Sequence, residues 1–145
     1  MASRGAAAEV AALLDASLIV AAADASDINH AAAVAWLGRV DEPLLVGALT
    51  LVEADHVLQR GLGLRATLAL LDSVAAGAVR VVPPTDADLA RAARLLEAAA
   101  EHRPRLADAA LVATAERLRV RRVGTFERRP LAVLQSGGRV LDLEP

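Results

Sequence analysis

Short apolar segments rich in Val and Leu alternate with longer segments of helical periodicity along almost the whole chain. The apolar segments are bounded by turn residues and are expected to be strands; they lie at 10–15, 44–46, 79–82, 121–126 and 139–143. Strands that are separated by helices pair in parallel, because each connection must cross the sheet. The pattern therefore predicts an α/β fold, a three-layer α/β/α sandwich with a central parallel sheet.

The segments between these strands carry helix start and stop signals. Asp27 and Asn29 can cap a helix at 30–39, and Thr50 with Glu53 has the form of a capping box. That box would open a helix ending at Gly61. Further helices are expected at 64–76, from Thr85 or Asp86 to His102, and at 106–118, with a turn or short helix at 17–23 and at 130–134.

The length of 145 residues fits one domain, which we place at residues 10–145 behind a flexible leader at 1–9. The apolar run after Arg4 is interrupted by Asp15, and a charge there opposes membrane insertion by roughly 3 kcal/mol. No uncharged apolar run in the sequence reaches the ~18 residues that a membrane span needs. A cytoplasmic protein without membrane contact is expected.

The residue types that are absent narrow the possible chemistry. The chain has no Cys, and every basic residue other than His is Arg. A thiolate zinc site, a disulfide, a Cys nucleophile, a Schiff-base Lys and the Lys of a P-loop are therefore excluded. One Phe, one Trp and no Tyr leave little capacity for stacking nucleic-acid bases on aromatic rings.

Charge is distributed unevenly along the chain. Residues 1–100 hold 7 Arg against 12 acidic residues, whereas residues 101–145 hold 9 Arg against 6 acidic residues. A basic C-terminal third is compatible with a partner that bears phosphate groups. It is equally compatible with an ordinary solvated surface.

Four carboxylates recur at the end of a predicted strand or near the start of a predicted helix: Asp15, Glu53, Asp108 and Glu127. Ligands of an open parallel sheet bind beyond the carboxyl ends of its strands, where these residues would converge. Two carboxylates ~5 Å apart repel by roughly 3 kcal/mol at an effective dielectric constant near 20. A hard divalent ion such as Mg²⁺ or Mn²⁺ relieves that repulsion and suits phosphoryl chemistry.

Each carboxylate also has a local interpretation. Asp15 could cap the turn after its strand. Glu53 could do no more than close the capping box with Thr50. Asp108 could complement the dipole of its helix, and Glu127 could pair with an adjacent arginine at the surface. Their joint placement, rather than any one of them, favours a metal site.

A glycine-rich pattern at Gly61–Ala66 fits the GxGxxA fingerprint of dinucleotide-binding proteins. The pattern follows a predicted helix rather than a strand, so the context for phosphate binding is absent. A small-molecule Rossmann-like enzyme therefore remains only a distant alternative.

Sequence motifs surround the four carboxylates in a fixed order. They are LLDAS with Asp15, DASDINHAAAVAWL at 24–37, ALTLVEADHVL with Glu53, LADAALVATAERL with Asp108, and VGTFERRPL with Thr125 and Glu127. In these motifs the chain resembles the PIN-domain ribonucleases, specifically the VapC-type toxins of bacterial toxin–antitoxin pairs. The resemblance covers nearly the whole chain, from about residue 13 to 143.

This resemblance implies an endoribonuclease that depends on Mg²⁺ or Mn²⁺, forms a homodimer and is silenced by a cognate antitoxin. Asp15 and Asp108 would be the principal metal ligands. Glu53 would be a further ligand or act through a water molecule, and Ser17 and Thr125 would line the site with hydroxyl groups.

One position departs from the family pattern. Where the family usually has Asp, in a Thr-x-Asp arrangement, this chain has Glu127. Glu still offers an oxygen, so we include it among the expected ligands and catalytic residues, but Mg²⁺ tolerates misplaced ligands poorly. The alternative is a catalytically weak PIN domain that serves as an RNA- or protein-binding module. Arg105, Arg128 and Arg129 are expected to hold the RNA backbone.

Overall fold

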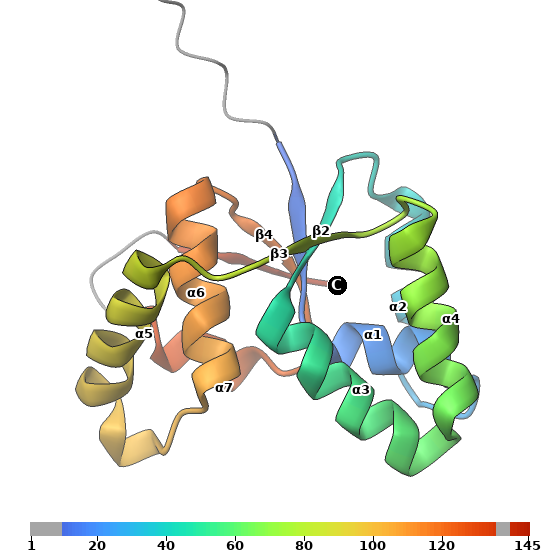
Figure 1. Ribbon diagram of the computed structural model, residues 1–145, viewed down its shortest axis with the longest axis horizontal. Coiled ribbons are helices and arrows are strands. Elements are labelled where there is room, and N and C mark those ends of the chain that lie inside the picture. The colour runs from blue at the N-terminus through green and yellow to red at the C-terminus, as the bar shows by residue number, and fades with distance from the viewer. Residues whose placement is uncertain (1–9, 136–139) are drawn as a thin grey trace, which may run out of the picture.

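Figure 1 shows the computed structural model, which describes residues 10–135 and 140–145. In this part of the chain, five parallel strands form one sheet in the order β3-β2-β1-β4-β5. The leader predicted at 1–9 lies outside the described residues. The strands are β1 (Ala12–Leu14), β2 (Leu44–Gly47), β3 (Arg80–Val82), β4 (Arg122–Gly124) and β5 (Asp142–Glu144).

Helices cover both faces of the sheet, so the predicted three-layer sandwich is confirmed. Helices α5, α6 and α7 pack on one face and α1, α2 and α4 on the other, while α3 leads away from the carboxyl edge (Figure 1). Their bounds are α1 (Ala16–Ala23), α2 (His30–Arg39), α3 (Ala48–Leu62), α4 (Leu64–Ala75), α5 (Asp86–Ala98), α6 (Leu106–Leu118) and α7 (Arg128–Val133).

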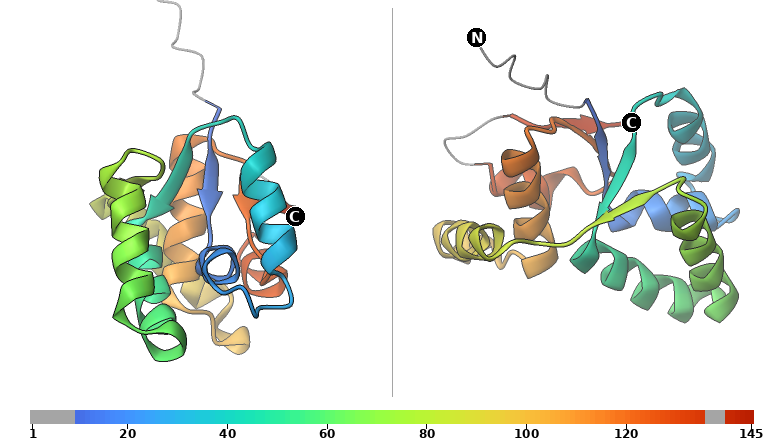
Figure 2. Two further views of the ribbon diagram at one scale, coloured as in Figure 1. Left: turned by 90° about the vertical axis from the view of Figure 1, so that its right-hand side faces the viewer. Right: turned by 45° about the horizontal axis from the view of Figure 1, so that its top comes forward.

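Strand β1 is apolar throughout because both of its faces are covered. Leu13 packs in the cluster formed with α5 and α6, whereas Ala12 and Leu14 pack in the cluster formed with α1, α2 and α3. All three side chains are buried. In Figure 2 (left) the strands point to one common edge, and α1 begins there directly below β1. The residue after β1 therefore lies at that edge.

The predicted capping box of Thr50 and Glu53 is wrong. Helix α3 begins earlier, at Ala48, with Gly47 as its N-cap, so Thr50 is buried inside the first turn. This removes the local role that was considered for Glu53. The helix also continues past Gly61, since the residue that separates it from α4 is Gly63, whose φ of 82° favours glycine.

The helix predicted to reach His102 ends at Ala98 and is followed by a short 3-10 helix, η1 (Ala100–His102). Arg103 then adopts a left-handed conformation with a φ of 49°. The start of this helix is capped at Thr85, one of the two predicted positions. The Thr85 hydroxyl accepts from the N–H of Asp88 at 3.0 Å, and the Asp88 carboxylate accepts from the N–H of Thr85 at 3.0 Å.

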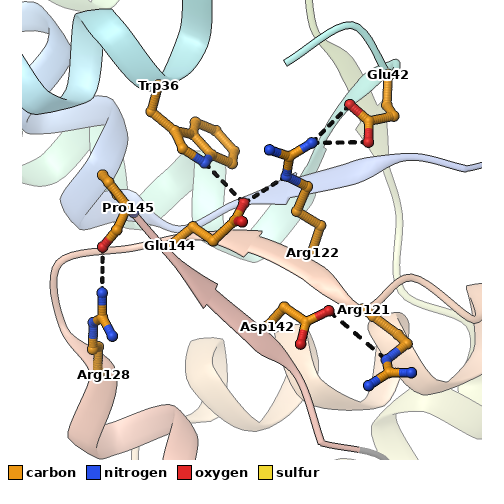
Figure 3. A network of polar contacts seen from close by, with 8 residues as sticks. All are labelled: Trp36, Glu42, Arg121, Arg122, Arg128, Asp142, Glu144 and Pro145. Carbon is orange, nitrogen blue, oxygen red and sulfur yellow. Dashed lines mark hydrogen bonds and ion pairs between the residues drawn. The ribbon is translucent and has the colours of Figure 1, made fainter. Parts of the chain in front are cut away.

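A polar network holds β5 against the sheet (Figure 3). The Glu144 carboxylate accepts from Nε1 of Trp36 at 3.0 Å and from Nε of Arg122 at 2.5 Å. Arg122 also donates to both oxygens of Glu42, at 2.9 and 3.0 Å. With β5 fixed in this way, the carbonyl of Glu144 accepts from the N–H of Thr125 at 2.6 Å. The end of the chain is thus connected to the carboxyl end of β4.

Among the described helices, none combines the length and the apolar character that crossing a bilayer requires.

Candidate metal centre at the edge of the sheet

The chain changes the face on which it winds between β1 and β4. The connections after β1 and β2 run over one face of the sheet, and those after β3 and β4 run over the other. Open α/β sheets bind ligands beyond the carboxyl ends of the strands at such a point. Asp15 directly follows β1 and Thr125 directly follows β4, so the fold places both at this crevice.

Asp15 is 4% exposed, and three donors hold its carboxylate. Oδ1 accepts from the N–H of Ala16 at 2.8 Å, which caps α1. Oδ2 accepts from the hydroxyls of Ser17 at 2.8 Å and Thr125 at 2.7 Å. Because each carboxylate oxygen has two lone pairs and Oδ1 accepts only one bond, Oδ1 keeps a lone pair that can bind a cation. The capping role that was considered for Asp15 is real and compatible with a ligand role.

Backbone groups set the direction in which the two hydroxyls donate. Ser17 Oγ accepts from the N–H of Phe126 at 2.9 Å, and Thr125 Oγ1 accepts from the N–H of Glu127 at 3.0 Å. Each hydroxyl has one proton, which is then directed to Asp15. The predicted site-lining residues therefore hold the Asp15 carboxylate in one orientation.

Two helices bring one further carboxylate each to Asp15. Asp108 lies in the first turn of α6 and is 5% exposed. Glu53 lies in the second turn of α3, and its side chain is 16% exposed. One oxygen from each of the three residues lies within 4.8 Å of the other two. We call Asp15, Glu53 and Asp108 the acidic triad.

The acidic triad fits a divalent metal ion. Glu53 Oε2 is buried and has no hydrogen-bond partner in the described part of the chain. A buried carboxylate oxygen without a donor is costly, and three carboxylates so close together repel one another. A hard divalent cation, which prefers oxygen ligands, would offset both costs.

The electrostatics of Asp108 reflect the same repulsion. Burial, with the nearby negative charges of Asp15 and Glu127, raises the pKa of the Asp108 carboxyl from 3.8 to about 6, against the opposing effect of Arg105. Strongly shifted carboxyl groups of this kind gather at functional sites. Ionisation of Asp108 is therefore less favourable than that of an ordinary aspartate, and a further cation at the site would favour it.

Arg105, at the N-cap position of α6, supplies positive charge to the triad. Its Nη2 donates to Glu53 Oε1 in a close ion pair, and its Nε lies 3.7 Å from Asp108 Oδ2. The Arg105 side chain is 61% exposed. Its guanidinium thus compensates the triad from the side that faces solvent.

A comparison of the sequence with protein families finds the PIN domain, which matches residues 12–134. The chain belongs to the PIN-domain family. The family resemblance that the motifs indicated is therefore confirmed.

Relatives of this PIN domain come from several bacteria. Ribonuclease VapC26 of Mycobacterium tuberculosis is 32% identical over 129 residues, which span 88% of this chain and 96% of that protein. The crystal structure of VapC20 from the same organism, described as a toxin that cleaves the sarcin-ricin loop, has a TM-score of 0.81 at 22% identity, covering 92% of this chain and 99% of that one. FitAcB from Neisseria gonorrhoeae has a TM-score of 0.64 at 21% identity, covering 90% and 96%.

The PIN domain brings together three of its four predicted carboxylates. Glu127 is exposed and lies outside the acidic triad, although it lines the same cleft. Asp15, Asp108 and Glu127 were expected as ligands, and Glu53 as a further ligand or as a residue acting through water; Glu53 is the one that joins Asp15 and Asp108 in the triad. Glu127 thus belongs to the rim of the cleft, from which its charge still acts on Asp108.

The three arginines that were expected to bind RNA differ in their surroundings. Arg105 is paired with Glu53 of the triad. Arg129 is an exposed residue of α7 that lines a second cavity. Arg128 donates instead to the backbone carbonyl of Pro145, toward which it points in Figure 3. Its guanidinium is engaged with the end of the chain.

The cleft at the triad has a volume of about 300 Å³ and includes residues that sequence reasoning had assigned to other tasks. Asp27 and Asn29 were expected only as helix caps, and Phe126 was not considered for the site. Asn29 occupies the N-cap position of α2 but makes no side-chain capping bond. Its place in the family-like stretch 24–37 is the signal that could have identified it.

Proposed function

We propose that this PIN domain is a metal-dependent endoribonuclease that hydrolyses RNA phosphodiester bonds in the cytoplasm, as the toxin of a toxin–antitoxin pair. The observation that carries the proposal is the buried acidic triad with an unpartnered Glu53 oxygen, in a chain 32% identical to a ribonuclease of the family. The expected hard ion is Mg²⁺ or Mn²⁺, because all available ligand atoms are carboxylate oxygens.

Asp15, Glu53 and Asp108 would hold the ion, and Glu127 would contribute from the rim of the cleft. When bound, the ion supplies Lewis-acid stabilisation of the charge that develops on the phosphate and activates a water for attack. Ser17 and Thr125 keep the Asp15 carboxylate oriented.

Basic residues beside the triad hold the RNA. Arg105 and Arg129 are exposed and lie on the side of the triad formed by α6 and α7. Contacts of arginine with phosphate oxygens give affinity without reading the bases, so binding weakens as salt concentration rises.

The partners of the protein are a cognate antitoxin and a second copy of this chain. The neighbouring structures support the first, since they include the DNA-bound VapBC complex of Salmonella typhimurium, with a TM-score of 0.65 at 14% identity. The homodimer rests on the family resemblance alone. An antitoxin that binds over the triad would explain how a cell tolerates the nuclease.

A test of the nuclease compares cleavage of structured RNA by the wild-type protein and by Asp15→Asn and Asp108→Asn variants, with Mn²⁺ or with EDTA. We expect cleavage only with the ion, and rates lower by about 100-fold or more in either variant. Asp72→Asn, at an exposed carboxylate of α4, is the matched control and should cleave like the wild type. Equal rates in all four proteins would rule the mechanism out.

Glu127 motivates the second candidate, a catalytically weak PIN domain that binds RNA or protein. The Glu127→Asp variant separates the two candidates, because it restores the residue that is usual in the family. A large gain in metal-dependent cleavage would indicate that the natural site is impaired. We expect comparable activity in both forms, since Glu127 lies outside the acidic triad.

A further inference from the structure

A second cavity, of about 460 Å³, adjoins the acidic triad. Residues of η1, of the turn between η1 and α6, of the first turn of α6 and of α7 line it. Arg105 borders both this cavity and the cleft at the triad, and Asp108 of the triad is part of its wall. The two spaces therefore meet at α6, and a chain molecule that lies on the triad can extend into the second cavity.

Basic side chains outnumber acidic ones in the lining of this cavity. His102, Arg103, Arg105 and Arg129 contribute to it, together with two carboxylates. Asp108 faces Arg105, and the Glu101 carboxylate lies 3.4 Å from Nε2 of His102. With three arginines against two carboxylates, the lining carries a net positive charge.

Two of the arginines are not engaged. Within the described residues, the side chains of Arg103 and Arg129 make no hydrogen bond or ion pair. Several other arginines are paired, such as Arg91 with Glu116 at 2.9 Å and Arg117 with Asp88 at 2.9 Å. Unpaired guanidinium groups that line one cavity repel each other, and a phosphate, which they can bind through paired N–H groups, relieves that repulsion.

The backbone accounts for the position of Arg103. The chain turns sharply after η1, with Arg103 in the left-handed region, before Arg105 caps α6. Arg129 is the second residue of α7 and lines the same cavity. Arg103 and Arg129, which are 26 positions apart in the sequence, therefore line the same cavity.

We propose that this cavity is a binding subsite for a backbone phosphate of the RNA, next to the phosphate that is cleaved. Arg103 and Arg129 hold this neighbouring phosphate, and Arg105 lies between it and the acidic triad. The subsite rests on the proposed nuclease function, which it deepens by assigning the path of the RNA on one side of the cleaved bond.

The test measures binding of a fluorescein-labelled single-stranded RNA of about 12 nucleotides by anisotropy, with EDTA present so that no cleavage occurs. The Arg103→Ala/Arg129→Ala variant is expected to raise Kd about tenfold. It should also lower the slope of log Kd against log salt concentration by about 1.4, the value for two lost phosphate contacts on a single strand. The matched control is Arg60→Ala/Arg65→Ala, which removes two exposed arginines that line neither cavity.

A second readout separates the subsite from the triad. Mn²⁺ binding, followed by electron paramagnetic resonance, is expected to have the same Kd in wild type and in Arg103→Ala/Arg129→Ala. A DNA strand of the same sequence should lose as much affinity as the RNA, because a phosphate contact does not read the sugar or the base. Loss of Mn²⁺ binding in this variant would overturn the proposal, since the arginines would then act on the triad.

The remaining outcomes distinguish the subsite from the nuclease. If the double variant and its control bind RNA equally, the subsite is overturned even where the wild type cleaves RNA. If the double variant loses affinity as expected but wild type never cleaves RNA with Mn²⁺, the subsite stands and the nuclease assignment fails. If wild type binds no RNA, both fail.

Discussion

Arg105 and Glu53 form an ion pair between α6 and α3, across 52 positions of sequence and inside the cluster proposed to bind the metal. Glu53 Oε1 accepts from the guanidinium, and Oε2 has no partner in the described part of the chain. The pair therefore compensates only part of the charge of Glu53. A metal ion and Arg105 compete for the same carboxylate.

Replacing Arg105 by Gln is expected to tighten Mn²⁺ binding by about three- to tenfold, because a guanidinium no longer repels the ion and no longer shares the charge of Glu53; a tenfold change corresponds to about 1.4 kcal/mol. RNA affinity should fall in the same variant, since one phosphate contact is lost. Isothermal titration with Mn²⁺ and anisotropy with RNA measure the two effects. Arg94→Gln, on the exposed surface of α5, is the control, and weaker Mn²⁺ binding in Arg105→Gln would contradict the competition.

Thr125→Val is expected to weaken Mn²⁺ binding and to lower stability. Thr125 is fully buried, and its hydroxyl donates to Asp15 and accepts from the N–H of Glu127. Removing it leaves a buried donor unpaired, at a cost of about 1–3 kcal/mol. Thr125→Ser keeps the hydroxyl and should retain most of the Mn²⁺ affinity. If the Val and Ser variants bind Mn²⁺ alike, the hydroxyl does not position Asp15.

The raised pKa of Asp108 predicts how the stability of the metal-free protein depends on pH. The folded pKa of about 6 lies above the unfolded value of 3.8, so the folded state binds more protons between these values. The free energy of unfolding is therefore expected to decrease as pH rises through this window, by roughly 2–3 kcal/mol for this group. Denaturation in EDTA at several pH values measures the decrease.

Asp108→Asn provides the check, because its amide stays neutral at every pH. We expect this variant to be more stable than wild type at pH 7.5 in EDTA and to show little difference near pH 4. Asp72→Asn, at an exposed position, should follow wild type throughout. A gap between Asp108→Asn and wild type that stays constant with pH would refute the assignment.

Gly124→Ala is expected to destabilise the protein by roughly 1–3 kcal/mol, through overpacking. A Cβ at this position of β4 would lie 2.6 Å from two ring atoms of Trp36, which is itself buried and held by Glu144. Gly38→Ala is the contrasting variant, because the same atom in α2 would meet nothing within 4 Å. It should stabilise the helix by about 0.5–1 kcal/mol. Thermal denaturation compares the two, and equal melting temperatures would contradict the close packing at Gly124.

The fold could be predicted from the sequence because each helix and strand depends mainly on the local pattern of apolar and polar residues. The alternation of apolar and helical segments predicted the parallel sheet, and the helices at 30–39 and 106–118 lie where they were expected. Asp15 could be placed in the same way, since its position relative to β1 alone puts it at the carboxyl edge of the sheet. The predicted ends of α3 were less accurate, because Thr50 looked like an N-cap and Gly61 looked like a C-cap, whereas the helix runs from Ala48 to Leu62.

Tertiary structure decided which carboxylates form the acidic triad. Glu53 and Glu127 are both glutamates near the carboxyl edge, and no local pattern distinguishes them. The packing of α3 against α1 and α6 brings Glu53 within reach of Asp15, whereas Glu127 stays exposed at the rim of the cleft. The ion pair between Arg105 and Glu53 and the wall that the two cavities share also result from the packing of these helices. Sequence determined which residues could take part, and the relative placement of helices far apart along the chain decided which of them meet.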